Sequence, residues 1–333
     1  MNRLLHRIQP HRWEDAQGFL KRVSTANHLR GTKELLNLIA GNKTSISLSD
    51  CPRVATYCLN SVPEIAQLSG IEVSRISGQS ICQINGELIT KSTFVASRSP
   101  KVCPECLYES PYLRGSWLLT FYTACPFHQK TLVNRCSQCK KLLKWDRRLA
   151  EYCSCGFDLR LFKSTTSDPE STLIALLIER RQNQSISINT KILGTSEIQN
   201  MATLSIDGLC KTIWFLGHCI TNLGSFGAGQ GRKVFDIEGA QLVIYSALKL
   251  LRSWPNELGQ KLDLLAIRQP LKNTDSLINR LFGPVQHYLR HEIDTAELFY
   301  LRTAYEQHIR RIWSRWDAPN RPTTSKQMEL DFQ

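Results

Sequence analysis

The feature that most constrains this chain is a run of four close cysteine and histidine pairs between residues 103 and 155. The pairs are Cys103 with Cys106, Cys125 with His128, Cys136 with Cys139, and Cys153 with Cys155. Two donors separated by two residues can reach one ion from a single tight turn, and a second pair completes the tetrahedron that zinc prefers. We therefore predict two structural Zn²⁺ ions per chain, with these eight side chains as ligands.

The order of the pairs predicts two consecutive sites, one formed by the first two pairs and one by the last two. A cross-braced arrangement, in which alternate pairs share an ion, uses the same eight ligands and stays open. A disulfide framework is not expected, because the first residues have no apolar signal core. The last pair is one residue shorter than the others, and Gly156 directly after it gives the backbone the freedom that such a turn needs. Because four protein donors fill each site, we expect structural and not catalytic ions.

Charge and composition indicate a soluble protein with polyanionic partners. The chain has 333 residues, and its 42 Lys and Arg against 29 Asp and Glu give a formal charge of +13. Such an excess favours binding to nucleic acid. The hydrophobic share of 42% is that of a globular protein, and no apolar run is long enough to span a membrane. The densest basic cluster, a candidate surface for nucleic acid or a protein partner, comprises Lys140, Lys141, Lys144, Arg147 and Arg148.

Hydrophobic periodicity predicts a mainly α fold on both sides of the zinc region. We expect helices over residues 14–29, 33–40, 171–182, 198–220, 237–254, 276–289 and 295–316. In the last of these, Arg310 and Arg315 lie off the apolar stripe and are further candidates for partner contacts. We place an N-terminal helical domain at 1–97, a tandem zinc-binding region at 98–167, a C-terminal helical bundle at 168–320 and a flexible tail at 321–333.

Residues 61–80 have the pattern of a helix-turn-helix. Ser61 and Glu64 form a capping box, Gly70 suits the turn, and Ile76 would anchor the second helix. That helix would expose Arg75, which is little positive charge for reading DNA. Any tight pair of helices gives a similar pattern, so the motif indicates a shape more strongly than a function.

Taken together, these motifs resemble the TniQ family, the target-selection proteins of transposition systems that also include TnsD. The resemblance rests on residues 19–23 with Asn27, 103–107, Trp117 before 124–128, Leu132, 136–139, 152–159, and 247–248 leading to Trp254 and Pro255. Residues 15–18 depart from the Glu-Ser-Leu step that is common before the first helix of the family. The chain also ends soon after its helical bundle, which makes it similar to the shorter TniQ proteins of CRISPR-associated transposons.

The resemblance implies a bacterial, cytoplasmic and DNA-associated adaptor without catalytic chemistry. Such an adaptor would dock on a Cascade-type complex with its guide RNA, or on target DNA, and recruit the AAA+ ATPase regulator TnsC and the transposase. A homodimer stays open, and no membrane partner is expected. The competing hypothesis is a sequence-specific protein that reads an attachment site directly through the helix-turn-helix and zinc modules. An enzyme is not expected, because the motifs assemble no nucleophile, base or open metal site.

Overall fold

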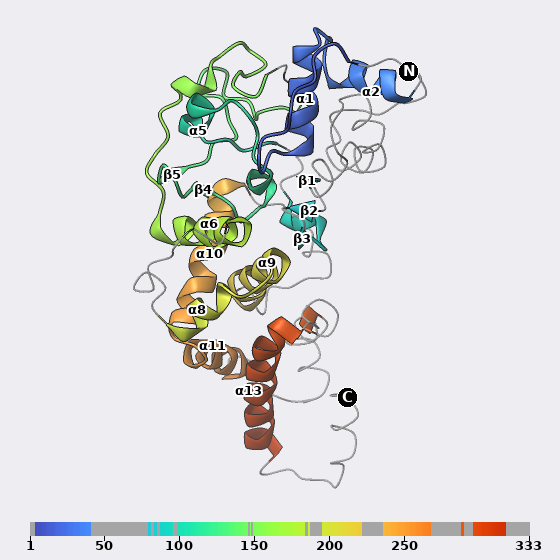
Figure 1. Ribbon diagram of the computed structural model, residues 1–333. Coiled ribbons are helices and arrows are strands. Elements are labelled where there is room, and N and C mark those ends of the chain that lie inside the picture. The colour runs from blue at the N-terminus through green and yellow to red at the C-terminus, as the bar shows by residue number, and fades with distance from the viewer. Residues whose placement is uncertain are drawn as a thin grey trace.

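The computed structural model describes a mainly helical protein with a zinc-finger-like central region (Figure 1). The described residues are 4–40, 79–80, 83–84, 87–95, 99–145, 147, 149–183, 186, 195–221, 236–267, 288–289 and 296–317. The N-terminal helices and the cysteine-rich region lie at one end, helices α6, α9 and α10 in the middle, and α11 and α13 at the other end. Within these ranges, no helix combines the length and the apolar character needed to cross a membrane.

Two helices form the N-terminal part, as predicted. Helix α1 spans Ala16–Ala26 and buries Phe19, Leu20 and Val23, and helix α2 spans Thr32–Ala40. The first helix starts later than the predicted residue 14, because Asp15 is the N-cap and its carboxylate accepts from the Gly18 amide at 3.0 Å. Most of the predicted helix-turn-helix, residues 61–78, lies outside the described residues.

Short strands and turns make up the region that leads into and through the cysteine pairs. Strands β1 (Gln79–Ser80), β2 (Gln83–Ile84) and β3 (Glu87–Leu88) pair antiparallel in sequence order, and β4 (Ala124–Cys125) pairs antiparallel with β5 (Lys130–Thr131). Short helical turns are η2 (Ser92–Phe94), α5 (Pro104–Glu109), η3 (Gly115–Leu118) and η4 (Leu159–Leu161). The apolar residues between the first two pairs, among them Trp117, Phe121 and Tyr122, are buried and supply most of the core of this region.

The C-terminal part is a stack of helices, with more breaks than the periodicity predicts. Its elements are α6 (Pro169–Gln182), α8 (Ser196–Met201), α9 (Ile206–Trp214), the π-helical turn η5 (Phe215–Ile220), α10 (Ile237–Arg252), α11 (Asn256–Ile267), η7 (Ala296–Leu298) and α13 (Phe299–Asp317). The prediction of a single helix over 198–220 was wrong. Ser205 caps a new helix through a 3.0 Å hydrogen bond from the Gly208 amide. Helix α11 was not predicted. Of the predicted helix 276–289, only residues 288–289 are described, and they are helical.

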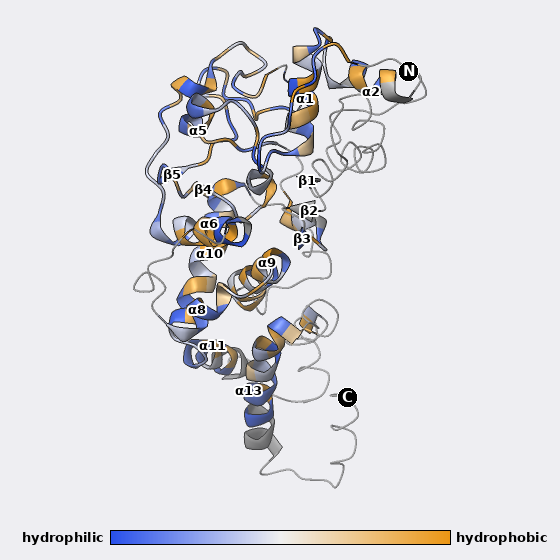
Figure 2. Ribbon diagram, viewed as in Figure 1, coloured by the Kyte–Doolittle hydropathy of each residue, from blue (hydrophilic) through white to orange (hydrophobic). Residues whose placement is uncertain are grey.

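One hydrophobic core runs through the cysteine-rich region and the C-terminal helices. It joins residues from Ile89 to Ile309, including Cys103, Tyr122 and Leu177, without a break at the expected boundary near Asp168. In Figure 2 the apolar colour is visible on α6, α9 and α10, and also on α1. Gly217 shows how closely this core is packed, because a Cβ added there would overlap the Val243 carbonyl oxygen. Helix α10 and η5 therefore touch backbone to backbone at this point.

Candidate metal centres

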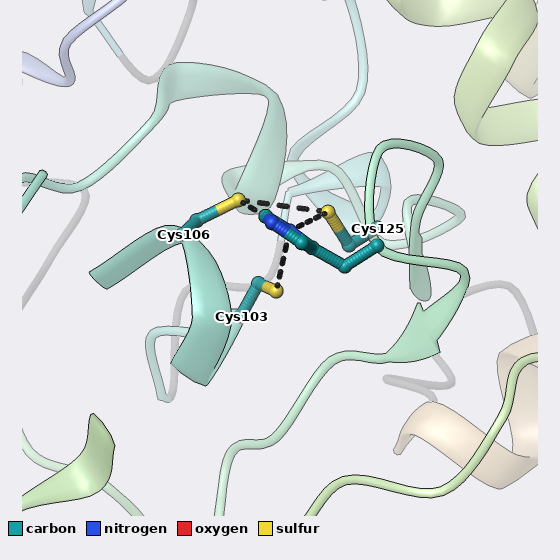
Figure 3. A group of neighbouring side chains, drawn as sticks. Cys103, Cys106 and Cys125 are labelled. Atoms are coloured by element: carbon teal, nitrogen blue, oxygen red, sulfur yellow. Dashed lines mark hydrogen bonds between the residues drawn. The ribbon is translucent and has the colours of Figure 1, made fainter. Parts of the chain in front are cut away.

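The first group of donors lies between α5 and the hairpin of β4 and β5 (Figure 3). Cys103 precedes α5 and Cys106 lies within it, whereas Cys125 ends β4 and His128 lies in the hairpin turn. The Nδ1 atom of His128 is 3.6 Å from the Cys103 Sγ and 3.4 Å from the sulfur atoms of both Cys106 and Cys125. The three cysteines are buried and the histidine is half-buried. One side of the imidazole thus faces three sulfur atoms in a closed space.

The local sequence explains this geometry. Pro104 occupies the first turn of α5, where its missing N–H costs nothing, so the helix begins directly after Cys103. Cys103 and Cys106 are then one turn apart and point the same way. On the other side, Gln129 takes a positive φ of 52° in the turn that brings His128 back over Cys125.

The second group combines Cys136, Cys139, Cys153 and Cys155. The sulfur atoms of Cys136 and Cys155 are 3.7 Å apart, and those of Cys139 and Cys153 are 3.8 Å apart. Gly156 has a φ of +91°, as the shortened last pair requires. Cys155 is exposed at the end of the group, unlike any donor of the first group.

The eight donors therefore gather as two consecutive sets and not in the cross-braced arrangement. Within each set, all donor atoms lie within 4.8 Å of one another. A tetrahedral ion with Zn–S bonds of about 2.3 Å holds its sulfur atoms about 3.8 Å apart, close to the spacings found here. A disulfide would need sulfur atoms about 2.05 Å apart, and the cysteines of both sets are free thiols. The donor chemistry and the spacing both fit a metal ion.

The thiols of the first group cannot ionise independently. Hydrogen bonds with Cys106 and Cys125 raise the pKa of Cys103, whereas hydrogen bonds from Cys103 and Cys106 lower the pKa of Cys125. A bound cation would displace the thiol protons and stabilise all three thiolates.

A buried carboxylate connects the first group to the helices. Glu179 of α6 accepts hydrogen bonds from the Tyr122 hydroxyl at 2.6 Å and the Ser116 hydroxyl at 2.9 Å. Burial raises the pKa of Glu179, and burial also raises the pKa of Tyr122. Nearby, the Lys101 ammonium donates to the carbonyls of Leu119 and Tyr122, and burial lowers its pKa to about 7.

A buried lysine connects the N-terminal helix to the loop of the second group. The Nζ atom of Lys21 in α1 donates to the Trp145 carbonyl at 2.6 Å and to the Arg147 carbonyl. The side chain of Lys21 is itself buried. Lys21 and Trp145, the first of these acceptors, are 124 residues apart in the sequence.

Arg147, which was predicted to lie on the basic surface, is buried. Its guanidinium donates to the Ala150 and Lys144 carbonyls at 3.3 and 3.1 Å, and burial lowers its pKa to about 10. It closes the loop from within. Lys140, Lys141 and Lys144 are exposed, and Arg135, which the sequence analysis did not select, is exposed as well.

The remaining candidates are spread over the chain. Arg310 is exposed on α13, and Arg315 is on the same helix, with its side chain outside the described residues. Arg75 and Arg148 also lie outside the described residues. Glu109, Glu179 and Lys21 were not predicted to be important from the sequence. Of these, only Glu109 had a local signal, because it follows Cys106 by three residues in the sequence.

The fold and its two donor groups define a mainly helical protein with two consecutive Cys/His clusters that could hold metal ions. Residues 5–132 match the family model for TniQ, which supports membership of the TniQ family. The matched segment includes the first donor group and ends before the second begins at Cys136. The TniQ domain is associated with target selection in transposition. No match to the chain was found among curated proteins.

Proposed function

We propose that this protein is a non-catalytic adaptor that selects targets for a transposition system. It links a Cascade-type guide-RNA complex, target DNA, or both to the AAA+ ATPase regulator TnsC, which brings the transposase. The observation that carries the proposal is the TniQ match over residues 5–132. An adaptor of this kind works in the bacterial cytoplasm on DNA and needs surfaces for two partners rather than a reaction site.

The metal in both donor groups is Zn²⁺, with two ions per chain. Three cysteines with one histidine, and four cysteines, are the donor sets of structural zinc sites, in which four protein ligands complete the coordination. Cys103, Cys106, Cys125 and His128 hold the first ion, and Cys136, Cys139, Cys153 and Cys155 hold the second. The ions fix turns that have little regular secondary structure of their own, and each contributes folding free energy.

One partner surface is the exposed basic knuckle of the second group, defined as Arg135, Lys140, Lys141 and Lys144. No acidic residue occurs between positions 130 and 145, so this stretch carries only positive side-chain charge. Exposed lysines on a tight turn bind phosphate groups without base specificity. We therefore assign the basic knuckle to the nucleic-acid side of the adaptor.

Charge reversal tests this assignment. Replacing Lys140, Lys141 and Lys144 by Glu should weaken binding to duplex DNA or to the guide-RNA complex and leave zinc content unchanged. The comparison variant combines Arg310→Glu with Arg315→Glu and so changes charge on a helix far along the chain. It should weaken the association with TnsC or leave both associations unchanged. Pull-downs with the purified full chain, with and without target DNA, measure both associations.

The same pull-downs can overturn the adaptor. If the purified protein retains neither TnsC nor a guide-RNA complex, even with target DNA present, the bridging proposal is wrong. Tight binding to one defined DNA site at physiological salt would then identify a direct reader of an attachment site, acting through the helix-turn-helix and zinc modules. Weak binding that falls steeply with salt fits the adaptor, because it reports phosphate contacts alone.

A further inference from the structure

A carboxylate lies on the outer side of the His128 ring. The Oε1 atom of Glu109 is 3.0 Å from the Nε2 atom of His128, while Nδ1 on the other side of the ring faces the three cysteines. Glu109 is not one of the four donors of the first group. Its side chain is 62% exposed, so it reaches the ring from the solvent side.

Helix α5 explains why this carboxylate is in place. Cys103 caps the helix, Cys106 follows by three residues, and Glu109 follows by three more at its last position. Residues spaced by three lie on one side of a helix, so a single short turn presents two sulfur donors and the carboxylate toward the same hairpin. The Ser110 amide closes the turn on the Cys106 carbonyl at 2.9 Å, which fixes where Glu109 starts.

We infer that Glu109 is a positioning residue for the first metal centre. A neutral imidazole has one nitrogen with a proton and one with a free lone pair, and only the latter binds a metal. By accepting the Nε2–H of His128, Glu109 keeps the lone pair on Nδ1 and holds the ring in the plane that points it at the ion. The inference rests on the zinc occupancy proposed above.

Glu105 provides a matched control on the same helix. Its Oε2 atom lies 3.3 Å from the Cys103 Sγ, so it carries the same charge as Glu109 but contacts a sulfur donor instead of the His128 ring. If Glu109 acted only by adding negative charge near a cation, Glu105→Ala and Glu109→Ala would have equal effects. If Glu109 acts through the ring, Glu109→Ala weakens the site more than Glu105→Ala does.

The test uses the zinc-loaded full chain and three variants, Glu109→Ala, Glu109→Gln and Glu105→Ala. Release of Zn²⁺ to a chromogenic chelator is followed by stopped flow, and the ions are exchanged for ¹¹³Cd²⁺ to record separate resonances for the histidine-containing site and the all-cysteine site. Glu109→Ala should release one ion about tenfold faster than wild type, at the low end for such outer partners. It should also shift the resonance of the histidine-containing site and leave that of the all-cysteine site in place.

The conservative variant and the control complete the test. Glu109→Gln should give an intermediate rate, because an amide oxygen accepts the same hydrogen bond without the charge. Glu105→Ala, which leaves the contact with the His128 ring in place, should accelerate zinc release less than Glu109→Ala does. A wild-type rate for Glu109→Ala, equal acceleration by Glu105→Ala, or equal movement of both resonances would overturn the inference. Wild-type protein that contains no metal in the first group would instead overturn the zinc proposal, and it is recognised before any variant is made.

Discussion

The two donor groups use similar knuckles in different surroundings. The first has its three cysteines buried, a histidine oriented by Glu109, and a side-chain connection to α6 through Tyr122 and Glu179. The second consists of cysteines alone, exposes Cys155, and is held from α1 by Lys21 through backbone carbonyls. All three cysteines of the first group lie in the hydrophobic core, whereas the second group reaches this core through Cys136 and Cys153 and lies beside a loop that carries exposed charge. The same metal chemistry can thus maintain the fold at one position and present a surface at another.

The largest expected difference between the two groups is the effect on solubility of removing one cysteine ligand from each. Cys106→Ser removes a buried ligand of the core group, and because such sites contribute folding free energy on the order of 10 kcal/mol, we expect insoluble protein. Cys155→Ser removes an exposed ligand, and we expect soluble protein with less than two ions per chain. Soluble yield and elemental analysis measure both. Equal solubility of the two variants would show that the groups do not differ in this way.

Tyr122→Phe should reveal the connection of the first group to α6. The substitution leaves the buried Glu179 carboxylate with one hydrogen bond fewer, which costs about 2 kcal/mol of unfolding free energy. Urea unfolding of the zinc-loaded chain gives this value. Tyr245→Phe, at an exposed position on α10, is the control and should unfold like wild type.

Gly156→Ala should affect the second group alone. An alanine at a φ of +91° costs about 1 kcal/mol, although nothing lies within 4 Å of the added carbon. We expect faster loss of one ion, with the cadmium resonance of the all-cysteine site shifted and that of the histidine-containing site unchanged. Gly31→Ala is the matched control, because its surroundings are equally open and its φ is not in the left-handed region. Similar behaviour of the two alanine variants would contradict the prediction.

The smallest effect is a pH dependence that belongs to the first group. Burial raises the pKa of Glu179 above its ordinary value, so the folded chain binds this proton more tightly than the unfolded chain. Its contribution to stability is full below the ordinary pKa and declines as the pH rises through the raised one. Glu179→Gln keeps an acceptor oxygen but cannot ionise, and should lack this decline. Unfolding free energies of zinc-saturated protein from about pH 5 to about pH 8 should show the wild type losing stability relative to the variant; parallel curves would argue against it.

Local patterns in the sequence predicted the features that are determined by residues close together in the chain, namely the donor pairs, one turn and most helices. The spacing of the cysteine pairs predicted the two sets that come together, and Gly156 was assigned to the turn that needs it. Periodicity located α1, α2, α10 and α13, because each has its own apolar stripe, and a short apolar run located α6. Periodicity failed at 198–220, where apolar residues on both sides of Ser205 concealed the cap at that position.

Contacts between distant residues could not be predicted. Glu179 meets Ser116 and Tyr122 across 63 and 57 residues, and nothing near Glu179 in the sequence marks it as buried. Arg147 was grouped with its exposed neighbours because a charge on a loop is normally solvated, yet its guanidinium fills the inside of that loop. Whether a lysine or arginine is solvated or buried depends on carbonyl acceptors that only the folded chain brings near.

The contact of Lys21 with the carbonyls of Trp145 and Arg147 limits where this chain can be truncated. The family match ends at residue 132, which suggests a natural place to shorten the chain. A fragment of residues 5–132 would keep the first donor group but leave the buried Lys21 ammonium without its acceptors and Tyr122 without Glu179. An isolated TniQ segment of this chain should therefore be unstable and aggregate in solution. A fragment meant to fold by itself has to continue at least through α6.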